Sequence, residues 1–499
     1  MERRTRNMIF SLKGSNKRAR KAIKHRHNRN SASHKWYRET CFNFGSFSFT
    51  KDSNQLLTLA TLGSSKSRAD IYISGTDIAP IHCALVVNYK TGIVLVEERS
   101  PRWTRVYQDA QTRTNRMGRG NPPRVAVLKG FNTILSLGKD EKDPARFEFL
   151  WNLTPEETLE LIRRRISGAS QEIQRRCLVN FIGQTPALEN QPINHLPVAE
   201  LGSGAFGRVW KTVDGLSGDF IAVKMLHRPN DPHDERWLHN VRYARDREVA
   251  ILSRLRHPHV LQYLGSQGWD TGLVQIFFPL KSGSLHSLIT SRSIPSDKRM
   301  EAGHTALVHI LSAVDYLDYM GLVHRDIKPD NILYDLDHRG NLQFQLGDFG
   351  IANYQANAQT GAGTITYIAP EILDQRGRQT SRADVWSLFV TMLWVHNADQ
   401  FRHNQARGMF KDPSEVQKAV IGATLSNGTV AYIREMGIFD PEYRATAGQM
   451  LVILGRRDLI STAVEPLRPR HFELWMQTVT TGYSPYSRYI RRLMDIPSG

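Results

Sequence analysis

A glycine-rich run at residues 201–209 is the first place in this chain where residue types and spacing suggest chemistry. It reads Leu-Gly-Ser-Gly-Ala-Phe-Gly-Arg-Val, and such glycines let backbone N–H groups approach a phosphate. Similar runs open dinucleotide-binding folds or form plain turns, so the run alone is a weak signal. Here no helix-opening sequence follows. An apolar stretch from Val209, turn residues within 214–218 and a second apolar stretch at 220–224 predict a β-hairpin that lays N–H groups over phosphates.

Further patches of chemical character follow the run in a fixed order. They are the apolar stretch that ends at Lys224, a pattern of helical period at 245–255, then His324–Asn331, Gly347–Gly350, Gly363–Glu371, an apolar stretch at 384–394, and Arg444. Each patch alone has an ordinary interpretation, such as a turn, a solvated loop or a surface lysine. Their joint order and spacing resemble the eukaryotic protein kinase catalytic domain over residues 196–460, which implies a bilobal kinase fold.

The resemblance assigns phosphoryl transfer to four side chains. Lys224 is expected to pair with the α- and β-phosphates of ATP, and Glu248 to form its ion pair, with Glu235 as an alternative. Asp326 is expected to orient the attacking hydroxyl and accept its proton. Lys328 is expected beside the transferred phosphate, as in serine/threonine kinases. The predicted acceptor is therefore a Ser or Thr hydroxyl of a protein substrate.

The same resemblance predicts the metal and nucleotide sites. Asn331 and Asp348 offer oxygen ligands, which suit the hard cation Mg²⁺. The hinge between the lobes is expected to bind adenine through the Phe278 carbonyl and the Leu280 N–H. The residues predicted to bind ATP are Leu201, Gly202, Ser203, Gly204, Ala205, Phe206, Gly207, Val209, Ala222, Lys224, Phe278, Leu280 and Leu333. None of the catalytic or metal-binding residue types is missing, so an active enzyme is expected rather than a pseudokinase.

Two further expectations concern the activation segment. Arg325 places a cation beside the catalytic carboxylate, an arrangement that commonly requires a phosphorylated activation segment. Thr360 is the candidate phosphosite, although it could be a plain turn residue, and Thr364 is expected to pack beneath the substrate. Glu371 is expected to form a buried structural pair with Arg444, because burying either charge alone would be costly.

Residues 41–152 show a different pattern, with short apolar runs separated by turn residues. The runs are 56–62, 71–73, 84–87, 93–96, 125–128, 133–137 and 147–151, and this spacing predicts an all-β sandwich. The segments 62–63, 69–73, 81–85 and 128–138 resemble a forkhead-associated domain, a module that binds phosphothreonine.

The residues that bind phosphate in that family are replaced here. The positions correspond to Ser64, Ala79 and Arg102, where the family has an arginine, a serine and an asparagine, whereas the fold-supporting His82 is retained. Lys66, Arg68 and Arg102 are possible substitute cations, or ordinary surface residues. A phosphothreonine-containing adaptor is thus a possible partner of residues 41–152. A forkhead-associated module before a serine/threonine kinase resembles the fungal checkpoint-type kinases.

Positive charge is concentrated at the start of the chain. The formal net charge is +18, and residues 1–40 contain 13 Lys or Arg against two acids. We expect a basic disordered leader over 1–40, which could act as a nuclear-import signal, contact nucleic acid through backbone phosphates, or be merely solvated. A mitochondrial transit peptide fits less well. The expected location is the nucleus or the cytoplasm, with the nucleus favoured.

Length and composition complete the prediction. The 499 residues imply two to three domains, and the three cysteines suggest neither a disulfide framework nor a zinc cluster. No secretory signal or membrane-spanning segment is expected, so no membrane partner is predicted. Thr154 begins a predicted helix in a linker over 153–195, and 461–499 is expected to be a flexible tail, with an inhibitory segment as the alternative.

The sequence thus predicts an α+β multidomain protein in which an all-β sandwich precedes a bilobal kinase fold. The predicted function is an ATP- and Mg²⁺-dependent serine/threonine kinase in a checkpoint-type pathway. The alternative is an interaction scaffold whose phosphopeptide module carries the function.

Overall fold

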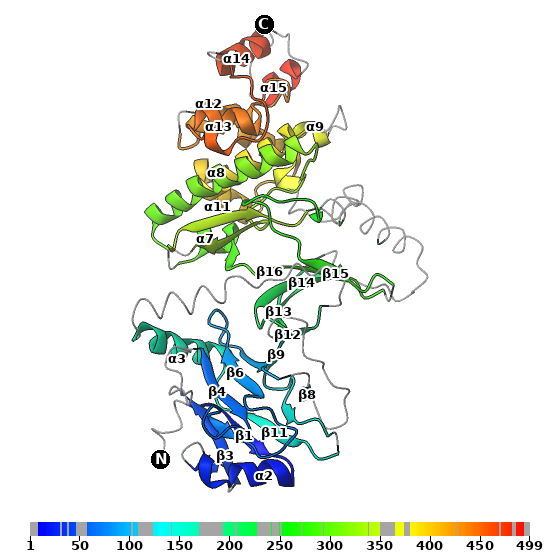
Figure 1. Cartoon of the computed structure of the whole chain (residues 1–499). Helices are drawn as coiled ribbons and strands as arrows, with labels where there is room; N and C mark the ends of the chain where they lie inside the picture. Colours follow the sequence, from blue (N-terminus) through cyan, green and yellow to red (C-terminus); the bar gives the residue numbers. More distant parts are fainter. Residues whose placement is uncertain are drawn as a thin grey trace. The chain divides into compact units, whose positions relative to one another are not determined.

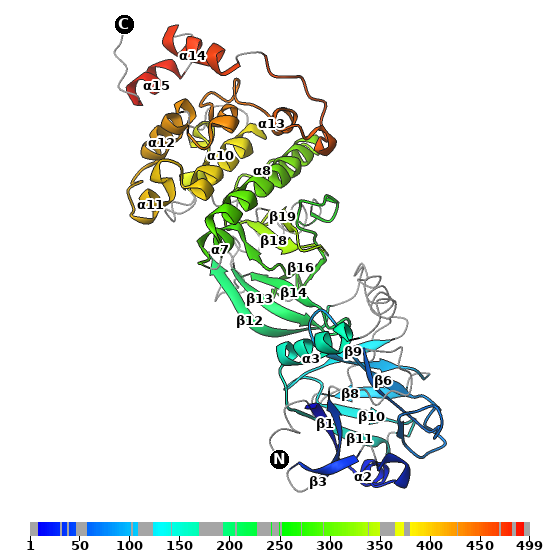
Figure 2. The ribbon, with the colours of Figure 1, turned by 90° about the vertical axis from the view of Figure 1, so that its left-hand side faces the viewer.

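The computed structural model divides the chain into two compact units. It describes residues 8–29, 32–36, 39–45, 57–100, 103–107, 123–140, 142–168, 193–204, 207–226, 241, 249, 252–270, 272–292, 294–337, 339–349, 365–373, 380–426, 428–468, 471–481 and 486–493. The first unit comprises Met1–Met225 and Gly265–Gln267, and the second comprises Leu226–Leu264 and Gly268–Gly499. Figures 1 and 2 show the elements of both units in two views.

The first unit begins with two β-sheets around one core. Their strands are β1 (Met8–Gly14), β2 (Ala32–Trp36), β3 (Glu39–Gly45), β4 (Thr58–Gly63), β5 (Ile71–Tyr72), β6 (Cys83–Val87), β7 (Val94–Glu98), β8 (Thr104–Tyr107), β9 (Arg124–Val127), β10 (Ile134–Leu137) and β11 (Ala145–Trp151). One sheet has the order β2-β3-β1-β11-β10-β8 and the other β5-β4-β6-β7-β9. Phe10 and Phe147 of the first sheet and Leu85 of the second share the core. The predicted all-β sandwich is confirmed.

The expectation of a disordered leader over 1–40 is wrong for residues 8–29. Strand β1 pairs with β3 and β11, and its Phe10 is fully buried. Helix α2 (Lys17–Ile23) lies beside β1 and β11 and buries Ala19, Ala22 and Ile23; the single turn η1 (Arg26–Asn28) follows it. Most basic side chains of this segment are exposed, whereas Arg18 is half-buried in an ion pair with Asp77. The prediction relied on the net charge of the whole segment, which concealed this amphipathic pattern. Because β1 is part of a sheet, the sandwich begins before residue 41.

Three strands of the first unit contain the predicted hairpin, which is formed by the second and third of them. They are β12 (His195–Gly204), β13 (Gly207–Asp214) and β14 (Phe220–Leu226), adjacent in that order; β15 (Gly265–Gln267) also belongs to this unit. Helix α3 (Pro155–Ser167) precedes them and begins, as predicted, at Thr154. The Thr154 side chain accepts from Glu157 N, and the Glu157 carboxylate accepts from Thr154 N, which forms a capping box.

The second unit is mainly helical. Its elements before residue 460 are β16 (Gln275–Pro279), β17 (Gly283–Ser284), α7 (Leu285–Thr290), α8 (Ser296–Tyr319), β18 (Ile332–Leu336), β19 (Leu342–Leu346), η4 (Ile365–Tyr367), α9 (Pro370–Leu373), α10 (Arg382–His396), η5 (Ala398–Gln400), α11 (Phe401–Ala406), α12 (Pro413–Leu425), η6 (Ala431–Gly437), α13 (Ala447–Ile453) and η7 (Arg457–Leu459). Helix α10 is buried along almost its whole length, as its all-round apolar sequence predicts. It packs against the long helix α8 (Figure 2). No helix among the described residues has the length and apolarity needed to cross a membrane.

The flexible tail expected over 461–499 is wrong for the described residues after 470. Helices α14 (His471–Thr481) and α15 (Ser487–Leu493) pack on the core of the second unit. Trp475 and Ile490 are fully buried, and the Tyr489 hydroxyl donates to Gln417 Oε1 at 2.6 Å. The apolar residues of α14 fall three to four positions apart on one face of the helix. That periodicity is the sequence signal for this packing.

Candidate active site

The predicted catalytic loop lies between α8 and β18, and Asp326 is at its centre. Asp326 is 8% exposed, and its Oδ2 accepts hydrogen bonds from Lys328 Nζ and Asn331 Nδ2, both at 2.8 Å. Asn331 Nδ2 also donates to the Asp326 carbonyl at 2.8 Å. The other carboxylate oxygen, Oδ1, has no hydrogen-bond partner among the described residues. One oxygen is therefore held by the protein, and the other has no hydrogen-bond donor among the described residues.

A second buried carboxylate fixes the backbone of the loop. Asp384, at the start of α10, is fully buried and accepts from His324 N and Arg325 N at 2.7 Å each. These two donors stabilise an unusual conformation, because Arg325 has a φ of 72°. Burial raises the pKa of the Asp384 carboxyl, while the neighbouring His324 and the two N–H donors oppose that rise. From the sequence, Asp384 was predicted only to begin a helix, and this role was not foreseen.

His324 joins the catalytic loop to the segment that carries the predicted metal ligand. Its Nδ1 accepts from Asp326 N at 3.3 Å, and its Nε2 lies 3.0 Å from the Gly347 carbonyl. Because a carbonyl only accepts, this geometry fits the neutral tautomer with a proton on Nε2. The ring also meets Phe349 edge-on, at 4.8 Å between centroids. The two predicted motifs therefore form one connected structure.

The donor set around Asp348 suits a hard cation. Gly347 N donates to the Asn331 carbonyl at 2.8 Å, which links the two predicted metal ligands through the backbone. Both amide hydrogens of Asn331 are used within the loop, so its amide oxygen is the atom left to bind a metal. Asp348 adds a carboxylate and has a φ of 57°, a strained value for a non-glycine residue. Oxygen ligands of these types fit Mg²⁺.

The glycine-rich residues form a two-stranded ribbon in the first unit. Gly202 pairs with Val209, Ser203 with Arg208, and Gly204 with Gly207, while Leu201 lies on β12. Ala222 and Lys224 lie on β14 of the same sheet. The predicted ATP-binding residues Ala205 and Phe206 lie outside the described residues.

The other predicted nucleotide residues belong to the second unit. Phe278 ends β16 with Pro279, Leu280 follows, and Leu333 lies on β18. Phe277, before the predicted hinge, is fully buried. Three other predictions, Glu248, Thr360 and Thr364, lie outside the described residues.

Glu371 and Arg444 form a buried, two-point ion pair. Arg444 Nη1 donates to Glu371 Oε1 at 2.6 Å, and Nη2 donates to Oε2 at 3.0 Å. The remaining three N–H groups of Arg444 donate to the carbonyls of Ile438, Arg382 and Phe439. All five donors of this fully buried guanidinium are thus satisfied.

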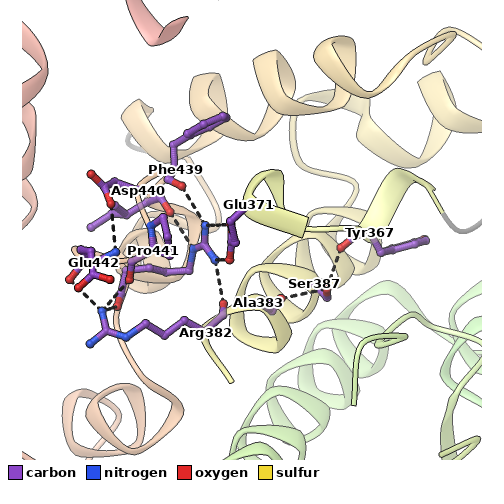
Figure 3. Close-up of polar contacts among 11 residues, drawn as sticks. Tyr367, Glu371, Arg382, Ala383, Ser387, Phe439, Asp440, Pro441 and Glu442 are labelled. Carbon is purple, nitrogen blue, oxygen red and sulfur yellow. Dashed lines mark hydrogen bonds and ion pairs between the residues drawn. The ribbon is translucent and has the colours of Figure 1, made fainter. Parts of the chain in front are cut away.

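Arg382 reinforces the same region and was not predicted. Its Nη1 donates to the carbonyls of Pro441, Glu442 and Arg444 at 2.7 to 2.9 Å, so α10 holds the loop before α13 (Figure 3). Ser387, one turn further along α10, donates to the Tyr367 carbonyl at 2.7 Å. The end of the activation segment and α10 are therefore joined by side chains as well as by apolar packing.

The candidate phosphate-binding loops of the sandwich use their polar groups internally. The Ser64 hydroxyl donates to the Ile78 carbonyl at 2.6 Å, and His82 Nδ1 accepts from Ala79 N at 3.1 Å. Burial lowers the pKa of His82. Arg18 of α2, which was not predicted, forms an ion pair with Asp77 beside these loops. Arg102 lies outside the described residues.

Comparison with known proteins identifies the class. The family model described as "Protein kinase domain" matches residues 197–452, slightly more than half of the chain. The chain belongs to the protein kinase domain family.

Curated relatives and one solved structure match the chain in part. The serine/threonine-protein kinase GG21441 of Drosophila erecta is 34% identical over 195 residues, 38% of this chain and 25% of that protein. The serine/threonine-protein kinase DCLK2 of Mus musculus is 30% identical over 285 residues, 55% of this chain and 35% of that protein. The match thus spans between a quarter and about a third of the length of these relatives. The crystal structure of Rad53 1-466 in complex with AMP-PNP aligns with a TM-score of 0.46 and 19% identity, covering 80% of this chain and 91% of that one.

Proposed function

We propose that this chain is a serine/threonine protein kinase that transfers the γ-phosphoryl group of ATP to protein hydroxyls in the presence of Mg²⁺. The observation that carries the proposal is the Asp326 carboxylate. Its Oδ2 is held by Lys328 and Asn331, and its buried Oδ1 has no partner among the described residues. A carboxylate held in this way can accept a hydrogen bond, and then a proton, from an attacking hydroxyl.

The surrounding residues orient Asp326 and neutralise negative charge. Asp384 and His324 hold the loop so that Asp326 keeps its orientation. Lys328 supplies a positive charge next to Asp326 and would neutralise charge on the group being transferred. Mg²⁺, for which Asn331 and Asp348 are the expected ligands, would neutralise charge on the phosphate oxygens. Lys328 and the names of the curated relatives both favour Ser or Thr as the acceptor.

The test is phosphoryl transfer from labelled ATP to a generic Ser/Thr protein substrate by the full chain. Asp326→Asn should lower kcat by about 10²- to 10⁴-fold, because the proton acceptor is lost. Asp348→Ala should abolish transfer with the fold intact, as shown by an unchanged circular dichroism spectrum. Asp297→Asn, at an exposed carboxylate in the first turn of α8, is the matched control and should retain full activity. Undiminished transfer in the Asp326 and Asp348 variants would refute the assignment.

We further propose that the sandwich is a forkhead-associated-like module and that the kinase acts in the nucleus, in a checkpoint-type pathway. The two-sheet fold and the buried His82 support the module assignment. Ser64 and Ala79 argue against phosphothreonine binding through these two side chains, because the Ser64 hydroxyl already donates to Ile78 and Ala79 has no polar side chain. The full chain should be titrated with a phosphothreonine peptide library and its unphosphorylated twins. Phosphate-dependent binding would support a phosphorylated adaptor as partner, and equal binding would contradict it.

A contact with nucleic acid is proposed for the basic residues of α2 and η1. Lys17, Arg20, Lys21, Lys24 and Arg26 are exposed, and residues 8–29 contain no acid. Because the helix is packed on the sandwich, these charges lie on an ordered surface rather than on a disordered leader. Binding to single-stranded DNA should weaken linearly in log–log form as salt increases. Affinity unchanged by Lys21→Glu with Lys24→Glu would contradict the proposal.

A further inference from the structure

We propose that the β-sandwich positions the ATP-binding hairpin of the kinase domain, with Asn88 as the main positioning residue. The inference rests on the proposed function, because β13 and β14 carry Val209, Ala222 and Lys224, which are expected to bind ATP. The sandwich and the hairpin belong to the same compact unit. Two kinds of contact join them: an apolar cluster, and hydrogen bonds to the turn between β13 and β14.

The outer face of the sandwich is apolar where the hairpin meets it. Along β7, Val94 and Val96 belong to the sandwich core, whereas Leu95 belongs to a separate cluster on the opposite face. Strand β9 repeats the pattern, with Val127 in the core and Ala126 in the second cluster. Successive side chains of a strand point to opposite faces, so both faces of these strands are covered.

The strands β12 to β14 cover the outer face of β7 and β9. Val213 of β13 is 1% exposed and lies in the cluster with Ile93 and Leu95, which are 1% and 0% exposed. Leu196 of β12 and Phe220 of β14 pack against the same cluster. Residues of β12, β13 and β14 therefore pack in or against the cluster that contains Ile93 and Leu95 of the sandwich, and separating the two parts would expose this apolar surface to water.

Asn88 holds the turn between β13 and β14 through its buried side chain. It is 0% exposed, and its Nδ2 donates to the Ser217 carbonyl at 3.0 Å and to Asp219 Oδ1 at 2.8 Å. Its Oδ1 accepts from Lys90 N at 2.9 Å, which orients the amide. Because the amide is buried and its two hydrogens go to the turn, moving the turn away would leave both donors unsatisfied.

Two further hydrogen bonds fix the same turn. The Thr91 hydroxyl donates to the Gly218 carbonyl at 2.7 Å, and Ala126 N donates to the Gly215 carbonyl at 2.7 Å. Strand β9 is the last strand of its sheet, so the turn satisfies a backbone donor on an otherwise open edge. The turn is thus held from β9 and from the segment that joins β6 to β7.

A side chain at Gly218 would be crowded by the sandwich. Gly218 has a φ of 69°, and a Cβ at this position would lie 3.0 Å from Leu95 Cδ2 and 3.3 Å from Ile93 Cγ2. A glycine therefore suits both the conformation and the close contact.

The geometry links this contact to the nucleotide residues. Strand β13 runs from Gly207, at the glycine-rich turn, to Asp214, at the sandwich contact. Strand β14 begins at the contact, and Lys224 lies five residues after Asp219, about 16 Å along an extended strand. The hairpin is therefore anchored at the end opposite Gly207. This anchoring sets the direction in which Lys224 and the glycine-rich strands are presented to ATP.

Two variants of the full chain test the proposal. Asn88→Asp removes the two donated hydrogen bonds and places a carboxylate against Asp219, and Gly218→Ala adds the clashing Cβ. Both should weaken binding of a fluorescent ATP analogue about 3- to 10-fold and raise the KM for ATP, while the KM for the protein substrate stays unchanged. Amide hydrogen exchange of residues 213–224 should become faster. The double variant Asn88→Asp, Asp219→Asn reverses donor and acceptor across the 2.8 Å contact and should restore part of the affinity.

Gly340→Ala is the matched control. Gly340 has a φ of 82°, and no atom lies within 4 Å of a Cβ at that position, so the variant introduces the same backbone strain without a clash. It should leave nucleotide affinity unchanged. Unchanged nucleotide affinity in both test variants, together with faster exchange at the turn, would overturn this inference, because the contact would then be structural only. Absence of phosphoryl transfer in a wild-type chain that still binds the analogue would refute the proposed function instead.

Discussion

At the scale of single residues, hydrogen bonds stabilise the buried charges of Arg444 and Asp384. Arg444 satisfies five donors with Glu371 and three carbonyl groups, and Asp384 accepts from two backbone N–H groups. Asp326 differs, because one of its oxygens is left without a partner among the described residues. Burying an unsatisfied acceptor costs free energy, and at Asp326 this acceptor belongs to the predicted catalytic loop, where a substrate hydroxyl could satisfy it.

Arg444→Lys should strongly destabilise the second unit. A lysine keeps the charge but cannot reproduce the planar fork that contacts both Glu371 oxygens and the carbonyls. We expect a loss of about 3–5 kcal/mol in the free energy of unfolding, measured by urea titration. Arg456→Lys is the control, since the Arg456–Asp458 pair is 41% and 62% exposed. Its expected effect is below about 1 kcal/mol, and equal losses in the two variants would contradict the argument.

At the scale of elements, His257, His259 and His309 pack together where the segment before β15, helix α8 and strand β19 meet. The rings of His259 and His309 stack at 3.9 Å, and Phe344 N donates to His309 Nδ1 at 3.2 Å. Burial, together with the smaller effect of neighbouring His259, lowers the pKa of His309 to about 3 and that of His257 to about 4, and burial also lowers the pKa of His259. All three are therefore neutral in the folded protein at neutral pH.

The second unit should lose stability as the pH falls from about 6.5 to about 4. In this range the unfolded chain protonates these histidines and the folded chain does not, so acid favours unfolding. His309→Asn keeps an acceptor near Phe344 N and removes the titrating ring. Its loss of stability should be smaller, by up to about 1.4 kcal/mol per pH unit. Urea midpoints at pH 7, 6 and 5 measure this, with His304→Asn, an exposed position on α8, as the control. Identical pH profiles for wild type and His309→Asn would contradict the prediction.

The whole molecule contains two compact units whose boundary does not follow the expected domain boundary. The hairpin strands β12 to β14 belong with the sandwich, although the family model assigns them to the kinase domain. The sandwich core and the core of the second unit are separate clusters. Each unit therefore has the buried apolar surface of an independent cooperative unit.

Phe10→Ala should separate the responses of the two units. Phe10 is fully buried and stacks on Phe44 at 4.7 Å, so its truncation should cost about 3–5 kcal/mol. Hydrogen exchange should accelerate in the sandwich and in β13, but not in α10. Lys24→Ala, at an exposed residue after α2, should change neither region. Acceleration that includes α10 would show that the chain unfolds as a single unit.

Features that depend on local sequence were predicted well. The helix start at Thr154, the hairpin turn at 214–218 and the all-round apolar helix α10 each involve residues close together in the chain. Their geometry follows from turn chemistry and periodicity. The fixed order of motifs likewise identified the kinase domain, because each motif keeps its residue types within a few positions.

The sequence by itself determined the class of protein, the residues proposed for catalysis and the all-β character of the N-terminal region. Only the tertiary structure decided how the basic residues 8–29 and the C-terminal helices are used, because burial of Phe10 and Trp475 depends on partners far away in the chain. The same is true of Asp384, whose role depends on two N–H groups about 60 residues earlier. The apolar runs of β7 and β9 indicate burial on both faces, but no local pattern shows that the hairpin carrying Lys224 is the cover.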